Sequence, residues 1–180
     1  MRFVCFLCLF FPFAAAGQVQ YSGASMIRPD DYHEWIWLSS GFGMSYSPAQ
    51  AENPDPPFDN VFVNPAAYRA FLKTGSWPDK TVLVLEVRSS KQKESINQHG
   101  HFQGDSARVE VHVKDTARFP DKKWGFFVFG ESAKNAAPAA ADTTCFSCHE
   151  KSGAVDTTFV QFYPILRDVA KLKGTLKAAE

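Results

Sequence analysis

Two cysteines and a histidine stand close together near the end of the chain, in the run Cys145-Phe146-Ser147-Cys148-His149. Two thiols three positions apart, followed directly by a histidine, form the attachment pattern of a c-type haem. Each thiol can add to one vinyl group of the porphyrin, and the imidazole of His149 then lies beneath the iron as its proximal ligand. The pattern predicts one covalently attached haem c, held by Cys145 and Cys148, with His149 as the metal ligand.

A cysteine pair at this spacing also occurs in structural zinc sites and in redox-active disulfides. A structural zinc site usually needs two such pairs, and the other cysteines of the chain, Cys5 and Cys8, lie within its first eight residues. A thioredoxin-like motif follows a strand in a βαβ unit, whereas the small residues 136–141 before this pair are typical of a loop. Haem attachment is therefore favoured over both alternatives.

The beginning of the chain has the pattern of a secretory signal. Arg2 is followed by an apolar run over residues 3–13 and by Ala14-Ala15-Ala16, and the run is too short to span a bilayer. We expect residues 1–16 to be a signal peptide cleaved near Ala16, and residues 17–180 to form a single haem c domain. Cleavage would also remove Cys5 and Cys8. The predicted location is the periplasm.

Charge and aromatic content give further bounds on function. The 19 basic and 19 acidic side chains balance to a net charge of zero, and they are interspersed along the chain. Neither a nucleic acid nor a membrane surface is therefore expected as a partner. The 17 Phe, 5 Tyr and 4 Trp residues suit a haem pocket, but an aromatic-rich core explains them equally well.

The hydrophobic pattern predicts a β-dominated α+β fold, an antiparallel sheet with a few short helices and a C-terminal haem c attachment segment. A short helix is expected over residues 30–38, and a clearer one after Asn64, which would cap it, with Pro65 in its first turn and Gly75 at its end. Residues 47–58 and 88–100 are expected to be loops. Strands are predicted for four apolar or alternating stretches: 58–63, 81–87, 107–114 and 124–129.

The second axial position of the iron has no obvious ligand in the sequence. Electron-transfer cytochromes often use a downstream methionine, but Met26 and Met44 both lie far upstream of the haem motif. Histidines in polar surroundings are more often solvated than metal-bound. We therefore expect an open distal position. The histidines considered for it are His33, His99, His101 and His112.

With these motifs placed, the chain resembles the cytochrome P-460 family, which includes the cytochromes c′-beta. The resemblance extends from about Tyr32 to Leu166 and implies a β-rich haem c protein, usually a homodimer. It also implies a five-coordinate iron whose open face binds small nitrogen-oxide molecules. Besides the haem motif, the matching blocks are Val61-Phe62-Val63-Asn64-Pro65, Lys73-Thr74-Gly75, Trp77-Pro78-Asp79 and Phe162-Tyr163-Pro164.

The resemblance also assigns roles to single positions. In the hydroxylamine-oxidising branch a lysine forms an extra covalent link to the porphyrin, and its position holds Leu85 here, which has no nucleophile. A distal glutamate that accepts protons in that branch matches Glu110. A distal arginine falls near Asp59, which carries the opposite charge. Two departures out of three favour the gas-binding, cytochrome c′-beta-like branch.

Two functions follow as hypotheses. The first is a periplasmic mono-haem c protein that binds nitric oxide in a small apolar distal pocket lined by Leu85, Phe62 and Phe102. The alternative is a hydroxylamine or nitric-oxide oxidoreductase that uses Glu110 as its base. Glu110 could equally be a solvated strand residue paired with Arg108 or Lys114. Simple electron transfer to a redox partner is a weaker option, because it would require a six-coordinate iron.

Overall fold

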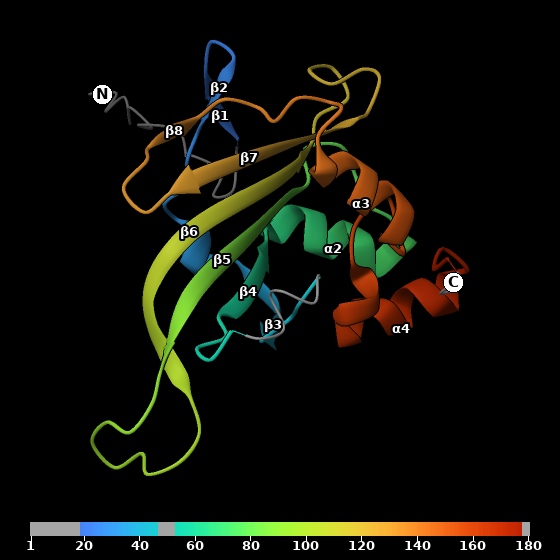
Figure 1. Cartoon of the computed structure of the whole chain (residues 1–180). Helices are drawn as coiled ribbons and strands as arrows, with labels where there is room; N and C mark the ends of the chain where they lie inside the picture. Colours follow the sequence, from blue (N-terminus) through green and yellow to red (C-terminus); the bar gives the residue numbers. More distant parts are fainter. Residues whose placement is uncertain (1–18, 47–52, 178–180) are drawn as a thin grey trace, which may run out of the picture.

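A five-stranded antiparallel sheet forms the centre of the computed structural model, which describes residues 19–46 and 53–177. The strands lie side by side in chain order, and the apolar strand β5 is the middle one (Figure 1). The predicted signal peptide, residues 1–16, lies outside the described residues. The strands are β3 (Ile36–Phe42), β4 (Phe58–Val63), β5 (Val82–Lys91), β6 (Phe102–Lys114) and β7 (Trp124–Gly130).

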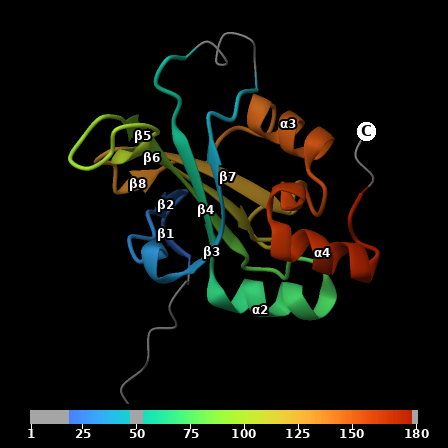
Figure 2. The same cartoon turned by 90° about the horizontal axis from the view of Figure 1, so that it is seen from below.

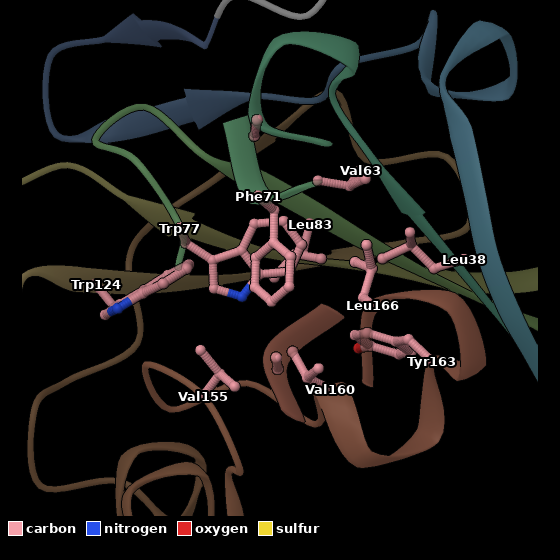
Figure 3. Packing of buried hydrophobic residues seen from close by; sticks show 12 residues of the cluster. Leu38, Val63, Phe71, Trp77, Leu83, Trp124, Val155, Val160, Tyr163 and Leu166 are labelled. Carbon is pink, nitrogen blue, oxygen red and sulfur yellow. The ribbon is translucent and has the colours of Figure 1, made fainter. Parts of the chain in front are cut away.

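Helices cover one face of this sheet. They are α2 (Pro65–Thr74), α3 (Thr144–Ser152) and α4 (Pro164–Lys173), and they lie together on the same side (Figure 2). A short 3₁₀ helix, η2 (Val160–Phe162), precedes α4. Phe71 of α2, Trp77, Leu83 of β5 and Leu166 of α4 meet in the core between the layers (Figure 3). The β-dominated α+β fold predicted from the sequence is confirmed.

A small second sheet covers part of the opposite face. It consists of β1 (Gln20–Ser22), β2 (Ser25–Ile27) and β8 (Asn135–Ala136). The second core lies here, and it takes Val109, Val111 and Val113 from β6. The alternation in residues 107–114 therefore predicted the faces of this strand correctly. Among the described residues, no helix is long and apolar enough to cross a membrane.

The helix after Asn64 is confirmed, but Asn64 does not cap it through its side chain. Its Oδ1 instead accepts a hydrogen bond from the backbone N–H of Val82 at 2.9 Å, and its Nδ2 donates to the carbonyl of Lys80 at 3.3 Å. Gly75 ends the helix with φ 74°, a left-handed conformation that glycine adopts without a Cβ penalty. Asn64 thus joins the start of α2 to the start of β5.

The helix predicted over residues 30–38 is wrong. Only the 3₁₀ turn η1 (Tyr32–Glu34) is helical, and the chain then becomes strand β3. Tyr32 and Trp35 are buried in the core under the small sheet, while Leu38 is buried on the helix side. The apolar spacing that suggested one helical face therefore serves two opposite faces of the sheet, and pairing with β4 provides the backbone hydrogen bonds.

The polar segment expected as a loop over residues 88–100 is shorter than predicted. β5 continues to Lys91 and β6 begins at Phe102, and the two form a long hairpin that extends beyond the body of the molecule (Figure 1). The side chains of this ribbon are mostly polar. Its residues therefore show no apolar alternation from which strands could be predicted.

Phe71 is expected to be one of the largest single contributors to stability. It is 0 % exposed and its ring lies 4.3 Å from that of Trp77, centroid to centroid. Phe71→Ala should lower the free energy of unfolding by about 3–5 kcal/mol, because a cavity replaces the ring. Urea denaturation of Phe71→Ala beside Leu72→Ala tests this, since the neighbouring Leu72 is 38 % exposed. Equal losses in the two variants would contradict the assignment of Phe71 to the core.

Candidate functional site

The motif Cys145 to His149 lies on helix α3, directly after a loop that follows β8. Both cysteines are free thiols and half-buried, and both line one cavity together with His149. All strand pairings that involve the named strands are antiparallel, so α3 does not stand in a βαβ unit of the thioredoxin kind. The structure brings the three predicted haem-attachment residues to a single cavity.

The cavity has a volume of about 350 Å³ and lies on the helix-covered face of the large sheet. The sheet forms the floor of this cavity. One row of side chains crosses the floor, with one residue from each strand, and neighbouring residues in the row are direct register partners. Most of these positions are apolar, and Glu110 carries the charge of the row. The row consists of Ser39, Val61, Leu85, Glu110 and Val128.

Leu85 and Glu110 are therefore side by side, as direct partners on β5 and β6. Glu110 lines the cavity and also accepts a hydrogen bond from Arg108 Nε at 2.6 Å. Its side chain is 36 % exposed and that of Arg108 is 52 % exposed, so the ion pair itself contributes little to stability. This geometry agrees with both interpretations of Glu110: it lines the cavity, and it is also a strand residue paired with Arg108.

The imidazole of His149 is held in one orientation by its surroundings. Its Nδ1 lies 2.8 Å from the carbonyl oxygen of Thr157, and the rings of Phe159 and Phe126 lie 4.4 and 4.7 Å away. A carbonyl can only accept, so Nδ1 carries the proton and Nε2 keeps its lone pair. Burial lowers the pKa of His149, although the Thr157 carbonyl and Glu110 oppose this. The neutral imidazole is the form that binds metals.

His112 is a buried member of the same site, although in the sequence it belongs to the polar set that alternates with the valines of residues 109–113. Its ring is stacked on Phe126 at 4.0 Å and lies 4.8 Å from that of His149. Burial, followed by the proximity of His149, lowers its pKa well below the ordinary value. His112 therefore acts here as a neutral aromatic wall of the cavity. Its Nε2 has no hydrogen-bond partner among the residues that the structure describes.

The other histidines considered as ligands lie elsewhere. His33 contacts Glu86 at 3.2 Å on the opposite face of the sheet, and His101 stacks on Phe42 at 4.8 Å near the β5–β6 hairpin. His99 is exposed in the same hairpin loop. None of these three lines the cavity.

Phe62 and Phe102 do not line the cavity either, in contrast to the prediction for the distal pocket. Val61 and Val63 on β4 pack toward the helices, so Phe62 between them must point to the opposite face. Its ring lies 5.5 Å from that of Tyr32 there. Phe102 begins β6 opposite Lys91, in the long hairpin. The aromatic wall is formed instead by Phe159, Phe162 and Tyr163.

Two cavity residues lie too far from the haem motif in the sequence to be predicted as part of the site. Met44 and Tyr46 follow β3, about 100 residues before the haem motif, and both line the cavity. Gly41 makes room for Met44, because a Cβ at this glycine would collide with the thioether sulfur. The signal for this arrangement was Gly41 at the end of a strand, where a missing side chain often marks a close approach.

Asp59 lines the cavity, as does the carboxylate of Glu110. It pairs in register with Gly41 on one side and with Val87 on the other, and Val87 in turn pairs with Arg108. Burial raises the pKa of Asp59, Arg108 opposes this effect, and Glu110 adds to it. The position that corresponds to a distal arginine in the resemblance thus presents a carboxyl group to the cavity.

The donor set suits a covalently attached haem. The two unpaired thiols, the imidazole with an unprotonated Nε2 and a largely apolar wall border the same space. A structural zinc ion would need more ligands close together, and among the described residues no group of three or more His, Cys, Asp or Glu side chains is placed to hold a metal ion.

Comparison with known proteins agrees with this chemistry. A search among curated proteins finds no match. The family model for cytochrome P460 matches residues 29–160, which is more than half of the chain and includes the cysteine motif, Leu85 and Glu110. Such a match implies a haem cofactor. The chain therefore belongs to the cytochrome P460 family.

Proposed function

We propose that this member of the family is a periplasmic mono-haem c protein with a five-coordinate iron that binds nitric oxide, as in the cytochromes c′-beta. The observation that carries the proposal is the shared cavity: both thiols, the imidazole of His149 and the apolar side chain of Leu85 border it. Covalent attachment through Cys145 and Cys148 follows from the spacing of the thiols on α3.

When bound, the haem supplies an iron that coordinates small diatomic ligands. The protein residues determine which ligands reach it. Cys145 and Cys148 would hold the porphyrin, and the unprotonated Nε2 of His149 would be the protein ligand of the metal. Leu85 and Val61 exclude water and give no hydrogen bond to an anion, so an uncharged diatomic such as nitric oxide is favoured.

One observation favours the alternative, a hydroxylamine or nitric-oxide oxidoreductase. Glu110 borders the cavity next to Leu85, where a carboxylate oxygen can accept a proton from a substrate N–H or O–H group. Arg108 would hold that carboxylate in place. We rank this function second, because leucine at position 85 cannot form the covalent link that the resemblance associates with hydroxylamine oxidation.

The absorption spectrum of the purified, reduced protein tests the proposal. We expect the spectrum of a high-spin, five-coordinate haem c, and a large shift when nitric oxide is added. Turnover of hydroxylamine with an electron acceptor would instead support the oxidoreductase. A low-spin spectrum that does not respond to nitric oxide would contradict both functions, because it would indicate a sixth protein ligand.

Met44→Leu identifies the residue involved if a sixth ligand is present. Met44 lines the cavity, and a methionine thioether is a common axial ligand of haem iron. We expect the spectrum of the reduced variant to equal that of the wild type, since leucine keeps the apolar wall. A change from low spin to high spin in the variant would show that Met44 binds the iron and would overturn the five-coordinate assignment.

The remaining parts of the proposal concern the cell and the assembly. Export to the periplasm with loss of residues 1–16 is expected, and the N-terminal sequence of the mature protein tests it. A homodimer is expected from the resemblance, and its mass in solution tests it. Neither a nucleic-acid nor a membrane partner is proposed.

A further inference from the structure

The turn that follows α3 has an unusual backbone. Asp156 and Thr157 are consecutive residues with φ 47° and 63°, in the left-handed region that non-glycine residues rarely adopt. Thr157 is β-branched, so its side chain makes this conformation more costly still. The turn is closed locally by a hydrogen bond from the Thr158 N–H to the Val155 carbonyl at 2.8 Å, and contacts from elsewhere in the molecule attach it to the sheet.

The turn presents a hydrogen-bond acceptor to His149. The carbonyl oxygen of Thr157 lies 2.8 Å from His149 Nδ1. At the end of α3, the N–H of Gly153 donates to the carbonyl of His149 at 2.9 Å. A Cβ on Gly153 would lie 2.5 Å from the carbonyl carbon of Thr157 and 2.6 Å from the carbonyl oxygen of His149. Glycine is thus required for the turn to lie directly against the backbone of His149.

Two groups from outside α3 hold the turn. Lys114, at the end of β6, donates from Nζ to Asp156 Oδ2 at 3.1 Å and to the carbonyl of Trp77 at 2.8 Å. The backbone N–H of Trp77 donates to the same Asp156 oxygen at 3.3 Å, and its Nε1 donates to Thr158 Oγ1 at 2.8 Å. The side chain of Lys114 is only 15 % exposed. These contacts fix both ends of the turn to the sheet side of the molecule.

We propose that Lys114 and the Asp156–Thr157 turn form a positioning element that sets how strongly His149 donates to the iron. Lys114 and Trp77 hold Asp156, Asp156 holds the left-handed turn, and the turn keeps the Thr157 carbonyl on Nδ1. A hydrogen bond donated by Nδ1–H makes the other ring nitrogen more basic. The inference rests on the proposed function, because it takes His149 as the proximal ligand.

Lys114→Met tests the proposal, and Lys122→Met is its matched control. Both lysines form one ion pair and lie over one aromatic ring: Lys114 contacts Asp156 and Trp124, and Lys122 contacts Glu150 and Phe146. Both pairs lie close to α3, but Lys114 contacts the turn and Lys122 does not. Each variant removes one positive charge and keeps an apolar stem.

The primary measurement is the iron–histidine stretching frequency of the reduced holoprotein by resonance Raman spectroscopy. We expect a lower frequency in Lys114→Met, because a looser turn weakens the Nδ1–H hydrogen bond. Lys122→Met should keep the wild-type frequency. An unchanged frequency in Lys114→Met, or an equal decrease in both variants, would overturn the proposal.

The midpoint potential of the haem gives a second readout. In it, the loss of the lysine charge and the weakening of the His149 ligand act in opposite directions. Loss of a nearby positive charge favours ferric iron and lowers the potential. A weaker histidine donor disfavours ferric iron and raises it. The potential of Lys114→Met should therefore lie above that of Lys122→Met. The reverse order would indicate that Lys114 acts only as a charge.

Asp156→Asn keeps the inference testable if Lys114→Met does not fold. Asparagine tolerates the left-handed conformation but binds the Lys114 ammonium less strongly, so the frequency should fall in this variant as well. An unchanged value would count against the proposal. Failure of the proposed function is recognised separately, since the wild-type protein would then show no high-spin haem c spectrum and no iron–histidine band.

Discussion

Cys145→Ser together with Cys148→Ser is expected to abolish covalent haem attachment. A serine hydroxyl does not add to the vinyl groups as a cysteine thiol does, so both links are lost. The fold itself should persist, because neither cysteine belongs to the two buried apolar cores. After denaturation and acid extraction, the wild-type chain should retain haem and the double variant should release all of it.

The single variants serve as controls for this result. Each should keep one thioether, and its pyridine haemochrome spectrum should lie between that of haem c and that of free haem b. Far-UV circular dichroism should be unchanged in all three variants. Haem that stays on the double variant after denaturation would contradict attachment through these thiols. Absence of haem from the wild-type protein would contradict the proposed function as a whole.

Much of the sheet could be predicted from the sequence because its pattern is local. Alternation over residues 107–114 assigned Glu110 and His112 to one face, and β6 has these faces. Leu85 and Glu110 were assigned to one site by the resemblance, and the register makes them direct partners. The first prediction depends only on side chains that alternate regularly within one strand, and the second depends on the resemblance.

Other features depend on contacts between distant parts of the chain. The apolar spacing of Tyr32, Trp35 and Ile36 fits one helical face, and only the presence of β4 makes residues 36–42 a strand. His112 looked polar, but the position of α3 buries it against His149. Met44 looked too remote to matter, and the path of the chain after Gly41 brings it to the cavity. Apart from Gly41, which marks a close approach, no local pattern carries this information.

The substitution with the most diagnostic effect is Leu85→Lys. In the floor row, position 85 lies between Val61 and Glu110, so the new amine faces the Glu110 carboxylate across one strand pair. That carboxylate can accept the proton that the amine loses when it attacks a carbon atom of the porphyrin. The new C–N bond replaces one C–H bond of the porphyrin and one N–H bond of the amine. This change is a two-electron oxidation. Added hydrogen peroxide is the oxidant and is reduced to water.

We expect peroxide-treated Leu85→Lys to show a strongly red-shifted Soret band. Its mass should fall by two hydrogen atoms relative to the untreated variant. Val61→Lys is the matched control, because it places a lysine in the same row but one strand further from Glu110. Leu85→Met controls for the loss of the leucine side chain alone. Neither control should give the shift.

The result for Leu85→Lys distinguishes gas binding from hydroxylamine oxidation by changing a single side chain. If Leu85→Lys forms the link and also gains hydroxylamine oxidation, the cavity and Glu110 already suit that chemistry, and leucine is what restricts the native protein to binding gas. If the link forms without activity, the reversed charge at Asp59 becomes the next position to change, since it borders the same cavity. An unchanged spectrum would contradict the alignment of Leu85 with the cross-linking lysine, and with it the basis for preferring the gas-binding branch.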